Sequence, residues 1–378
     1  MTNPNQAHID SLAQRIAEAR DAYYNGKPIM SDAAFDAIED DLRKLDPTNA
    51  VFQKVGAPVG GTWPTVKHEI PMGSLNKAQV LSEVETWHAS VKSPLLVVMD
   101  KLDGASLELV YENRRLVRAV TRGDGLTGDE ITRNVLLMKG VVKTLPPTIA
   151  GNPTPAKTFV RGEVVVKKSD FAVHFKGESN PRNTANGTMK RQSDASKCAH
   201  LTVIAYQILP GGEALPSKSA ELKELRACGF ETPRWSVALR PSDVDREYQD
   251  YVARIRGQLD YIIDGLVLSV DDKDAREAEG DLGGRPKAEI AFKFPHSKKP
   301  TILRNVEWQV GNSGRITPVA VFDAVDIDGK SIERASLAGI RQVERLKLYP
   351  GCTVLVALRN DVIPRIEANV SLGLENDE

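Results

Sequence analysis

The sequence predicts an α+β protein of several domains. Three observations lead to this expectation. Apolar residues in the first 50 positions follow helical spacing, strand-like runs alternate with helical patches in the middle of the chain, and short strands with glycine-containing turns follow Pro300. We therefore expect an N-terminal helical hairpin, a central domain of antiparallel or mixed sheets, and a C-terminal β-barrel. The predicted boundaries are 1–62, 63–298 and 299–378.

The helical hairpin is predicted by two apolar series with steps of three and four residues. The first contains Ile9, Leu12, Ile16 and Ala19, and the second contains Phe35, Ile38, Leu42 and Leu45. Asn25 to Pro28 should break the first helix, because Asn, Gly and Pro favour turns. Ser31 is a suitable N-cap for the second helix.

The central domain is predicted by strand-like runs, many of them rich in β-branched residues. These runs are 95–99, 107–111, 116–121, 158–167, 201–209, 265–270 and 290–294. Residues 112–115 should form a hairpin turn, and residues 220–228 and 244–256 should be helical. After Pro300 the strands become shorter and end with residues 352–358, as expected for a small barrel.

Composition sets broad limits on function. The chain has 378 residues, 41% hydrophobic and 27% charged, and a formal net charge of -1. These values are ordinary for a globular protein and give no global sign of nucleic-acid binding, although basic residues can still gather locally. No apolar run approaches the roughly 20 residues of a membrane span, and no secretion signal is visible, so we expect a cytoplasmic location and no membrane partner. The three cysteines are far apart and predict neither a disulfide framework nor a zinc site.

Lys101, Asp103 and Gly104 follow an apolar run and form the most informative local pattern. A lysine at a strand end, beside a carboxylate and a glycine, can act as a nucleophile toward phosphorus if its site favours the neutral amine. Arginine cannot take this role because it does not lose its proton. Alone, this pattern is more often a strand followed by a solvated turn.

Further motifs follow in order: residues 121–125 (TRGDG), 161–163 (RGE), 180–183 (NPRN), 264–268 (DGLVL) and 291–295 (AFKFP). With Lys101, they resemble the NAD-dependent DNA ligases, members of the covalent nucleotidyltransferase superfamily. The resemblance continues through 306–311, 315–320 and 361–364, which look like the family's oligonucleotide-binding (OB) fold, and covers nearly the whole chain. It implies a helical domain that recognises the nicotinamide mononucleotide (NMN) half of NAD, an adenylation domain and an OB-fold domain.

The resemblance also implies roles for individual residues. Lys101, with Asp103 and Lys293, would be catalytic through a lysyl-AMP intermediate. The residues expected to bind NAD are Tyr23, Asp32, Asp36, Arg122, Glu163 and Lys293. Those expected to bind DNA are Arg182, Lys190, Arg191 and Arg359, and Asp264 is the expected Mg²⁺ ligand.

Several positions depart from the family pattern. Ser269 stands where the family has a lysine, so Lys273, Lys287 or a metal ion would have to supply the missing charge. Met99 stands where the family often has a glutamate that contacts adenine, and Asp100 should point to the other strand face. The family's zinc, helix-hairpin-helix and BRCT modules are not in the sequence, which fits either a compact enzyme or a piece of a longer one.

The expected function is sealing of nicks in duplex DNA with NAD and Mg²⁺, by a monomer. One alternative keeps the fold but uses ATP or joins RNA ends. Another is a catalytically silent protein that binds nicks.

Overall fold

The computed structural model describes residues 6–24, 30, 38–39, 41–42, 45–46, 49–53, 63–91, 95–178, 180–238, 240–282, 284–293, 298–310, 316–327, 330–337, 339–359 and 363–375. The chain forms two compact units. The first contains residues 1–29 and 45–294, and the second contains residues 30–44 and 295–378.

The first predicted helix is confirmed as α1 (Gln6–Tyr24), and a short 3₁₀ helix, η1 (Ala50–Gln53), follows later. The apolar series of α1 is buried, as its spacing predicts: Ile9, Leu12, Ile16 and Ala19. Ile38 and Leu42 of the second series are also buried, whereas the breaker at 25–28 and Ser31 lie outside the described residues. Within the described ranges, no helix has the length and apolar character of a membrane span.

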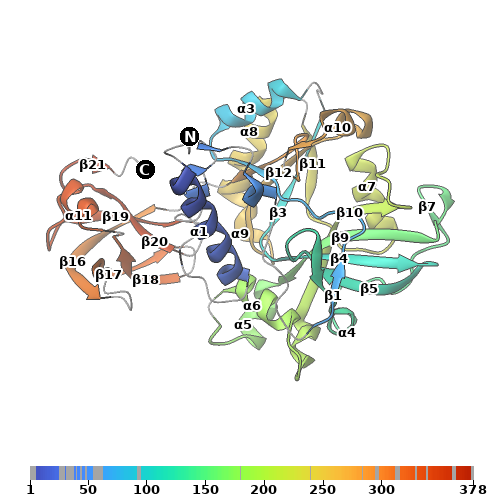
Figure 1. Cartoon of the computed structure of the whole chain (residues 1–378), viewed down its shortest axis with the longest axis horizontal. Helices are drawn as coiled ribbons and strands as arrows, with labels where there is room; N and C mark the ends of the chain where they lie inside the picture. Colours follow the sequence, from blue (N-terminus) through green and yellow to red (C-terminus); the bar gives the residue numbers. More distant parts are fainter. Residues whose placement is uncertain are drawn as a thin grey trace. The chain divides into compact units, whose positions relative to one another are not determined.

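A five-stranded sheet forms one layer of the first unit (Figure 1), and apart from the parallel β15–β2 pair its neighbours are antiparallel. Its order is β11 (Trp235–Ala238), β3 (Leu96–Leu102), β12 (Ile263–Val270), β15 (Glu289–Lys293) and β2 (Asn76–Ala78). The predicted runs at 95–99, 265–270 and 290–294 are confirmed as β3, β12 and β15. This sheet carries Lys101 on β3 and Lys293 on β15.

A second, antiparallel sheet has four strands, in the order β10 (Leu201–Pro210), β9 (Lys157–Val166), β4 (Ala105–Glu112) and β5 (Arg115–Thr121). All four predicted runs are confirmed. The turn between β4 and β5 places Asn113 and Arg114 at positive φ, as in a tight hairpin. Three two-stranded ribbons complete the unit: β1 (Thr65–Lys67) with β6 (Thr127–Asp129), β7 (Thr148–Ile149) with β8 (Asn152–Pro153), and β13 (Asp281–Leu282) with β14 (Arg285–Pro286).

The two large sheets share a core because alternate side chains of each strand face opposite sides. Val97 and Met99 of β3 pack in one cluster with Leu107 and Leu109 of β4. The alternate β3 residues, such as Val98, pack in another cluster with residues of helices α3 and α8. The five-stranded sheet therefore lies between helices and the second sheet, and Lys101 continues the alternation of Met99 toward the second sheet.

Helices connect these strands. They are α3 (Leu81–Ser90), α4 (Thr132–Val135), α5 (Lys168–His174), α6 (Pro181–Met189), η2 (Ser196–His200), α7 (Lys218–Ala227), α8 (Pro241–Asp250), η3 (Tyr251–Ile255), α9 (Arg256–Gln258) and α10 (Lys273–Glu279). The helix predicted at 220–228 is confirmed as α7, which begins where the Ser217 side chain accepts a hydrogen bond from the Ala220 amide. The helix predicted at 244–256 is confirmed by α8 to α9, and its middle, η3, is π-helical.

The second unit contains a six-stranded antiparallel sheet and helix α11 (Ile340–Arg345). The strand order is β18 (Lys330–Ser336), β17 (Ile316–Ile327), β16 (Lys298–Val310), β19 (Thr353–Arg359), β20 (Ile363–Asn369) and β21 (Leu374–Glu375). Bulges in β16 and β17 bend these long strands around one apolar core. The predicted β-barrel has the form of a curved sheet, whose edge strands β18 and β21 do not pair with each other within the described residues.

Candidate active site

Lys101 and Lys293 stand in one row across three neighbouring strands. Gly265 of β12 is paired with Lys101 of β3 on one side and with Lys293 of β15 on the other. Residues paired across strands point to the same face of a sheet. The two lysine side chains therefore stand on one face, on either side of a residue that has no side chain.

Asp264 reaches both lysines because β12 contains a β-bulge. In the pairing with β3, Leu102 is opposite Ile263 and Lys101 is opposite Gly265, which leaves Asp264 as the extra residue. Its Oδ1 lies 2.8 Å from Lys101 Nζ, and its Oδ2 lies 3.1 Å from Lys101 Nζ and 3.1 Å from Lys293 Nζ. A single carboxylate thus holds two ammonium groups.

The charge of Asp264 is stabilised by these partners. Its side chain is 5% exposed, and burial by itself would raise the pKa. The ammonium groups of Lys101 and Lys293 outweigh burial and lower the pKa of Asp264 below its usual range. Asp264 is therefore ionised at neutral pH.

Two glycines allow the strands to approach closely around this row. A Cβ on Gly265 would lie 2.4 Å from the carbonyl oxygen of Phe292, and a Cβ on Gly104 would lie 2.3 Å from that of Val164. Real Cβ atoms do not approach backbone oxygens this closely. The glycines of the KxDG and DG motifs are thus needed for close packing of the strands.

Arg182 is linked to Asp103 from helix α6. Asn180 caps this helix by accepting a hydrogen bond from the Asn183 amide at 2.8 Å, and Pro181 occupies the first turn. Arg182 Nη1 lies 2.9 Å from Asp103 Oδ1. The NPRN motif is therefore a helix start that brings an arginine to the residue two positions after Lys101.

Glu163 lies on β9, where it is paired with Ser106 of β4. The Ser106 hydroxyl donates to Glu163 Oε2 at 3.0 Å. Burial raises the pKa of Glu163 to about 7, although Ser106 and the charges of Lys101, Arg122 and Arg182 act in the opposite direction. A Cβ added at Gly104 would lie 2.9 Å from Glu163 Cγ, so Glu163 lies next to the KxDG motif.

Arg122 follows β5 at the start of a turn built by the TRGDG motif. Its amide donates to the carbonyl oxygen of Ser106 at 3.1 Å, so the turn is attached to the strand that supports Glu163. The Asp124 side chain accepts hydrogen bonds from the amides of Leu126 and Thr127 and closes the turn. Ser106 could not be recognised from the sequence, because a serine in a strand carries no motif of its own.

Ser269 and Met99 are placed as the strand alternation predicts, but their partners could not be read from the sequence. The Ser269 hydroxyl donates to Glu289 Oε1 at 2.8 Å, across the β12–β15 pair. Lys273, one candidate for a compensating charge, forms ion pairs with Glu213 and Glu277 on the surface. Asp100 points to the opposite face from Met99, as expected, and accepts a hydrogen bond from the Tyr261 hydroxyl at 2.6 Å.

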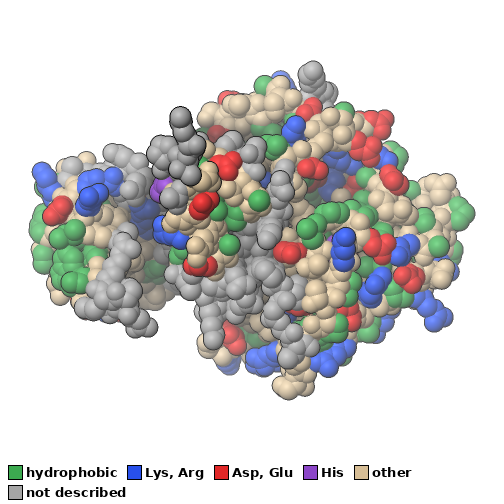
Figure 2. All heavy atoms as spheres, viewed as in Figure 1, with side chains coloured by type: hydrophobic (Ala, Val, Ile, Leu, Met, Phe, Trp, Pro, Cys, Tyr) green, Lys and Arg blue, Asp and Glu red, His purple; other side chains and the backbone are tan. Residues whose placement is uncertain are grey.

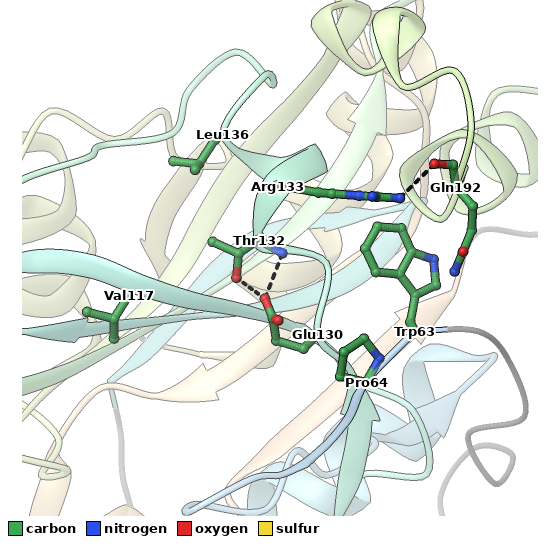
Figure 3. A pocket seen from close by; sticks show the side chains of 8 residues that line it. All are labelled: Trp63, Pro64, Val117, Glu130, Thr132, Arg133, Leu136 and Gln192. Atoms are coloured by element: carbon green, nitrogen blue, oxygen red, sulfur yellow. Dashed lines mark hydrogen bonds between the residues drawn. The ribbon is translucent and has the colours of Figure 1, made fainter.

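Lys190 lies at the C-terminus of α6 and forms a 2.9 Å ion pair with Asp129. Its carbonyl oxygen accepts a hydrogen bond from Trp63 Nε1 at 2.8 Å, and Arg191 follows it. Trp63 lines an open depression of about 560 Å³, in which Arg133 lies 4.4 Å above the Trp63 ring and donates to the carbonyl oxygen of Gln192 (Figure 3). The depression is separate from the lysine row, since none of the catalytic candidates lines it.

The side chains of the remaining predicted residues lie outside the described part of the structure. Tyr23 lies in α1, but its side chain is outside the description, as are Asp32 and Asp36 entirely. Arg359 ends β19 in the second unit, again without a described side chain. On the face shown in Figure 2, Lys and Arg side chains are interspersed with Asp and Glu side chains.

A metal ion has few matching ligands at the lysine row, because both oxygens of Asp264 already face ammonium groups. Among the described residues, Asp170, His174 and His200 do bring three potential ligand atoms within 4.8 Å of one another. Lys139 already bonds the Asp170 carboxylate at 2.7 Å, and the two imidazole rings are stacked. Mg²⁺ prefers oxygen ligands, so this mixed set does not match it.

Comparison with known protein families identifies two consecutive parts of the chain. Residues 61–297 match the NAD-dependent DNA ligase adenylation domain, and residues 300–377 match the NAD-dependent DNA ligase OB-fold domain. The chain is 40% identical to a DNA ligase of Sorangium cellulosum over 97% of its length, 37% identical to one of Treponema denticola over 96%, and 38% identical to DNA ligase 1 of Nocardia farcinica over 94%. It spans 57%, 57% and 54% of those relatives, respectively. With its lysine row and the order of its motifs, the chain belongs to the NAD-dependent DNA ligase family.

Proposed function

We propose that this chain is an NAD-dependent DNA ligase that seals nicks in duplex DNA and that Lys101 is its nucleophile. The observation that carries the proposal is the cluster of Lys101, Asp264 and Lys293 beside Glu163. This cluster combines an amine with the cations that phosphoryl transfer requires. Family membership supports NAD and DNA as the substrates.

In the first step, Lys101 Nζ attacks the adenylyl phosphorus of NAD. A nitrogen–phosphorus bond forms, and the bond from that phosphorus to the NMN phosphate oxygen breaks. The ammonium must release a proton before it attacks, and Asp264 Oδ2, at 3.1 Å, is within transfer distance. Because the pKa of Asp264 is lowered, it would hold that proton only transiently.

Lys293 would move from Asp264 to an oxygen of the attacked phosphate. A phosphate entering the row competes with Asp264 for the two ammonium groups, and its negative charge grows during the transfer. Glu163 would accept hydrogen bonds from the ribose hydroxyls, and Arg122 would contact the nucleotide. The charges of Lys101 and Arg122 both act on Glu163, which supports these roles.

The later steps act on DNA. An oxygen of the 5′-phosphate at the nick attacks the lysyl-AMP phosphorus and displaces Lys101, and the 3′-hydroxyl then attacks the activated 5′-phosphate and displaces AMP. We propose that Arg182, Lys190, Arg191 and Arg359 contact DNA phosphates and that the protein acts as a monomer. Tyr23, Asp32 and Asp36 would bind the NMN half of NAD in the first step.

Mg²⁺ is the metal expected to neutralise phosphate charge in this chemistry. Asp264 does not fit as its ligand while it is paired with Lys101 and Lys293. Oxygens of the substrate phosphates are the better candidates, and no step above depends on the ion. Omitting the metal from the assay tests this requirement.

Mass spectrometry tests the function directly. Incubation with NAD and Mg²⁺ should add one adenylyl group to the protein, and Lys101→Ala should abolish the addition. Lys223→Met, which changes an exposed lysine on α7, is the control and should still form the adduct. An adduct with ATP but not with NAD would favour the ATP-dependent alternative, and no adduct with either would favour a silent DNA-binding protein.

A further inference from the structure

His68 is enclosed between β1 and the Arg122 turn, where it is 4% exposed. Its Nδ1 lies 2.8 Å from Glu108 Oε1. Its Nε2 lies 3.1 Å from the carbonyl oxygen of Thr121 and 3.3 Å from that of Arg122. Each ring nitrogen therefore faces oxygen atoms.

These contacts determine where the protons are. Carbonyl oxygens only accept hydrogen bonds, so Nε2 must carry a proton. A second proton must lie between Nδ1 and Glu108, because two lone pairs at 2.8 Å would repel each other. Arg161 Nε lies 3.2 Å from Glu108 Oε2 and, being always charged, favours the ionised carboxylate. The second proton therefore resides on the ring, and both nitrogens donate.

The backbone of residues 68–72 also forms hydrogen bonds with the Arg122 turn. The His68 amide donates to the carbonyl oxygen of Leu126 at 2.8 Å, and the Met72 amide donates to that of Gly125 at 2.8 Å. At Gly123, which has a φ of +57°, an added Cβ would lie 1.8 Å from the carbonyl oxygen of Thr127. The turn is thus held from outside by residues 68–72 and has little freedom within.

The same turn is connected to the nucleotide site. The Arg122 amide donates to the Ser106 carbonyl oxygen, and the Ser106 hydroxyl donates to Glu163. The ring of His68 therefore contacts the carbonyl groups on both sides of the Arg122 Cα atom. Hydrogen bonds from Arg122 to Ser106 and from Ser106 to Glu163 continue this chain of contacts to the nucleotide site. Displacing the His68 ring would shift the backbone of Arg122 and with it the position of the Arg122 side chain.

We infer that His68 is a positioning residue for nucleotide binding: its doubly protonated ring, held by Glu108, fixes the backbone of Thr121 and Arg122 and thereby places Arg122 beside Glu163. This inference rests on the proposed function, because it takes Arg122 and Glu163 as NAD-binding residues. His68 does not touch the substrate. It acts through Arg122.

The test compares His68→Gln and Glu108→Gln with the wild-type protein in self-adenylylation at varied NAD concentration. Both variants should raise KM for NAD by about tenfold or more, the effect expected from loss of a charge-assisted hydrogen bond, with a smaller change in kcat. Glu221→Gln is the matched control. Glu221 is also a buried carboxylate with an arginine partner, Arg276, but it lies on α7. This variant should lose stability without a change in KM.

A second measurement uses the wild-type protein and needs no activity. Selective ¹⁵N labelling of the six histidines should show one imidazole, absent from the His68→Gln spectrum, with protons on both nitrogens. A neutral His68 would overturn the inference, and so would an unchanged KM in folded His68→Gln. Absence of any wild-type adduct with NAD would instead refute the proposed function, and the spectrum would then decide the protonation of His68 alone.

Discussion

Asp264→Asn removes the only charge that we find between Lys101 and Lys293 within the described site. At 2.8 Å and an effective dielectric constant of about 20, one such ion pair has a Coulomb energy of about 6 kcal/mol, before the cost of removing the ions from water. Breaking a buried pair by removing one partner costs about 3–5 kcal/mol. Because the lysine side chains are 25% and 20% exposed, we expect about 3 kcal/mol less stability for the first unit.

The pH dependence gives this prediction a second signature. The pKa of Asp264 is lower in the folded protein than the ordinary 3.8, so its contribution is fully present above the unfolded value. It is lost as pH falls through the folded pKa. The stability difference between wild type and Asp264→Asn should therefore be constant above about pH 5 and shrink below pH 4.

Denaturant unfolding followed by tryptophan fluorescence can measure this difference. Trp63, Trp87 and Trp235 lie in the first unit and Trp308 lies in the second, so a Trp308→Phe background restricts the signal to the first unit. Adding Lys293→Met to Asp264→Asn should recover part of the loss, because one uncompensated ammonium is removed. If the free energy of unfolding of Asp264→Asn were within about 0.5 kcal/mol of the wild-type value at pH 7, the ion pairs of Asp264 would contribute little to stability.

Three further variants test neighbouring features. Gly265→Ala should destabilise the first unit by about 1–3 kcal/mol in the same unfolding assay. Gly257→Ala should not destabilise it, because a Cβ at Gly257 has no neighbour within 4 Å. Equal effects of the two substitutions would contradict the packing argument. Glu163→Gln should have the same free energy of unfolding as wild type near pH 4.5 and a free energy of unfolding about 3 kcal/mol higher at pH 7 and above. The reason is that the raised pKa of Glu163 makes wild-type stability fall as pH rises between those values. Parallel pH profiles of the two proteins would refute this prediction. Lys190→Met should weaken binding to nicked DNA and reduce the slope of log affinity against log salt concentration by about 1, as measured by fluorescence anisotropy. Lys223→Met should change neither quantity. An unchanged slope in Lys190→Met would show that Lys190 does not contact DNA phosphate.

The sequence predicted the strands and the residues at their ends, because alternation and turn residues are local signals. It could not predict the bulge at Asp264, which depends on how β12 pairs with β3. Nothing local in the sequence reveals that the His68 ring meets the carbonyl oxygens of Thr121 and Arg122 in space. Likewise, Ser269 was recognised as a departure, but its partner Glu289 follows from strand pairing. The sequence also could not predict that the edge strands β18 and β21 do not pair, because edge pairing is a long-range property.

The lysine row has a consequence for how this protein is made. Its members come from strands far apart in the chain, and β15, which supplies Lys293 and closes the row beside Gly265, is the last strand of its unit. During synthesis Lys101 leaves the ribosome long before its neighbours exist. If Lys101 is the nucleophile, as we propose, a nascent chain could not form the lysyl-AMP adduct until almost the whole first unit had emerged.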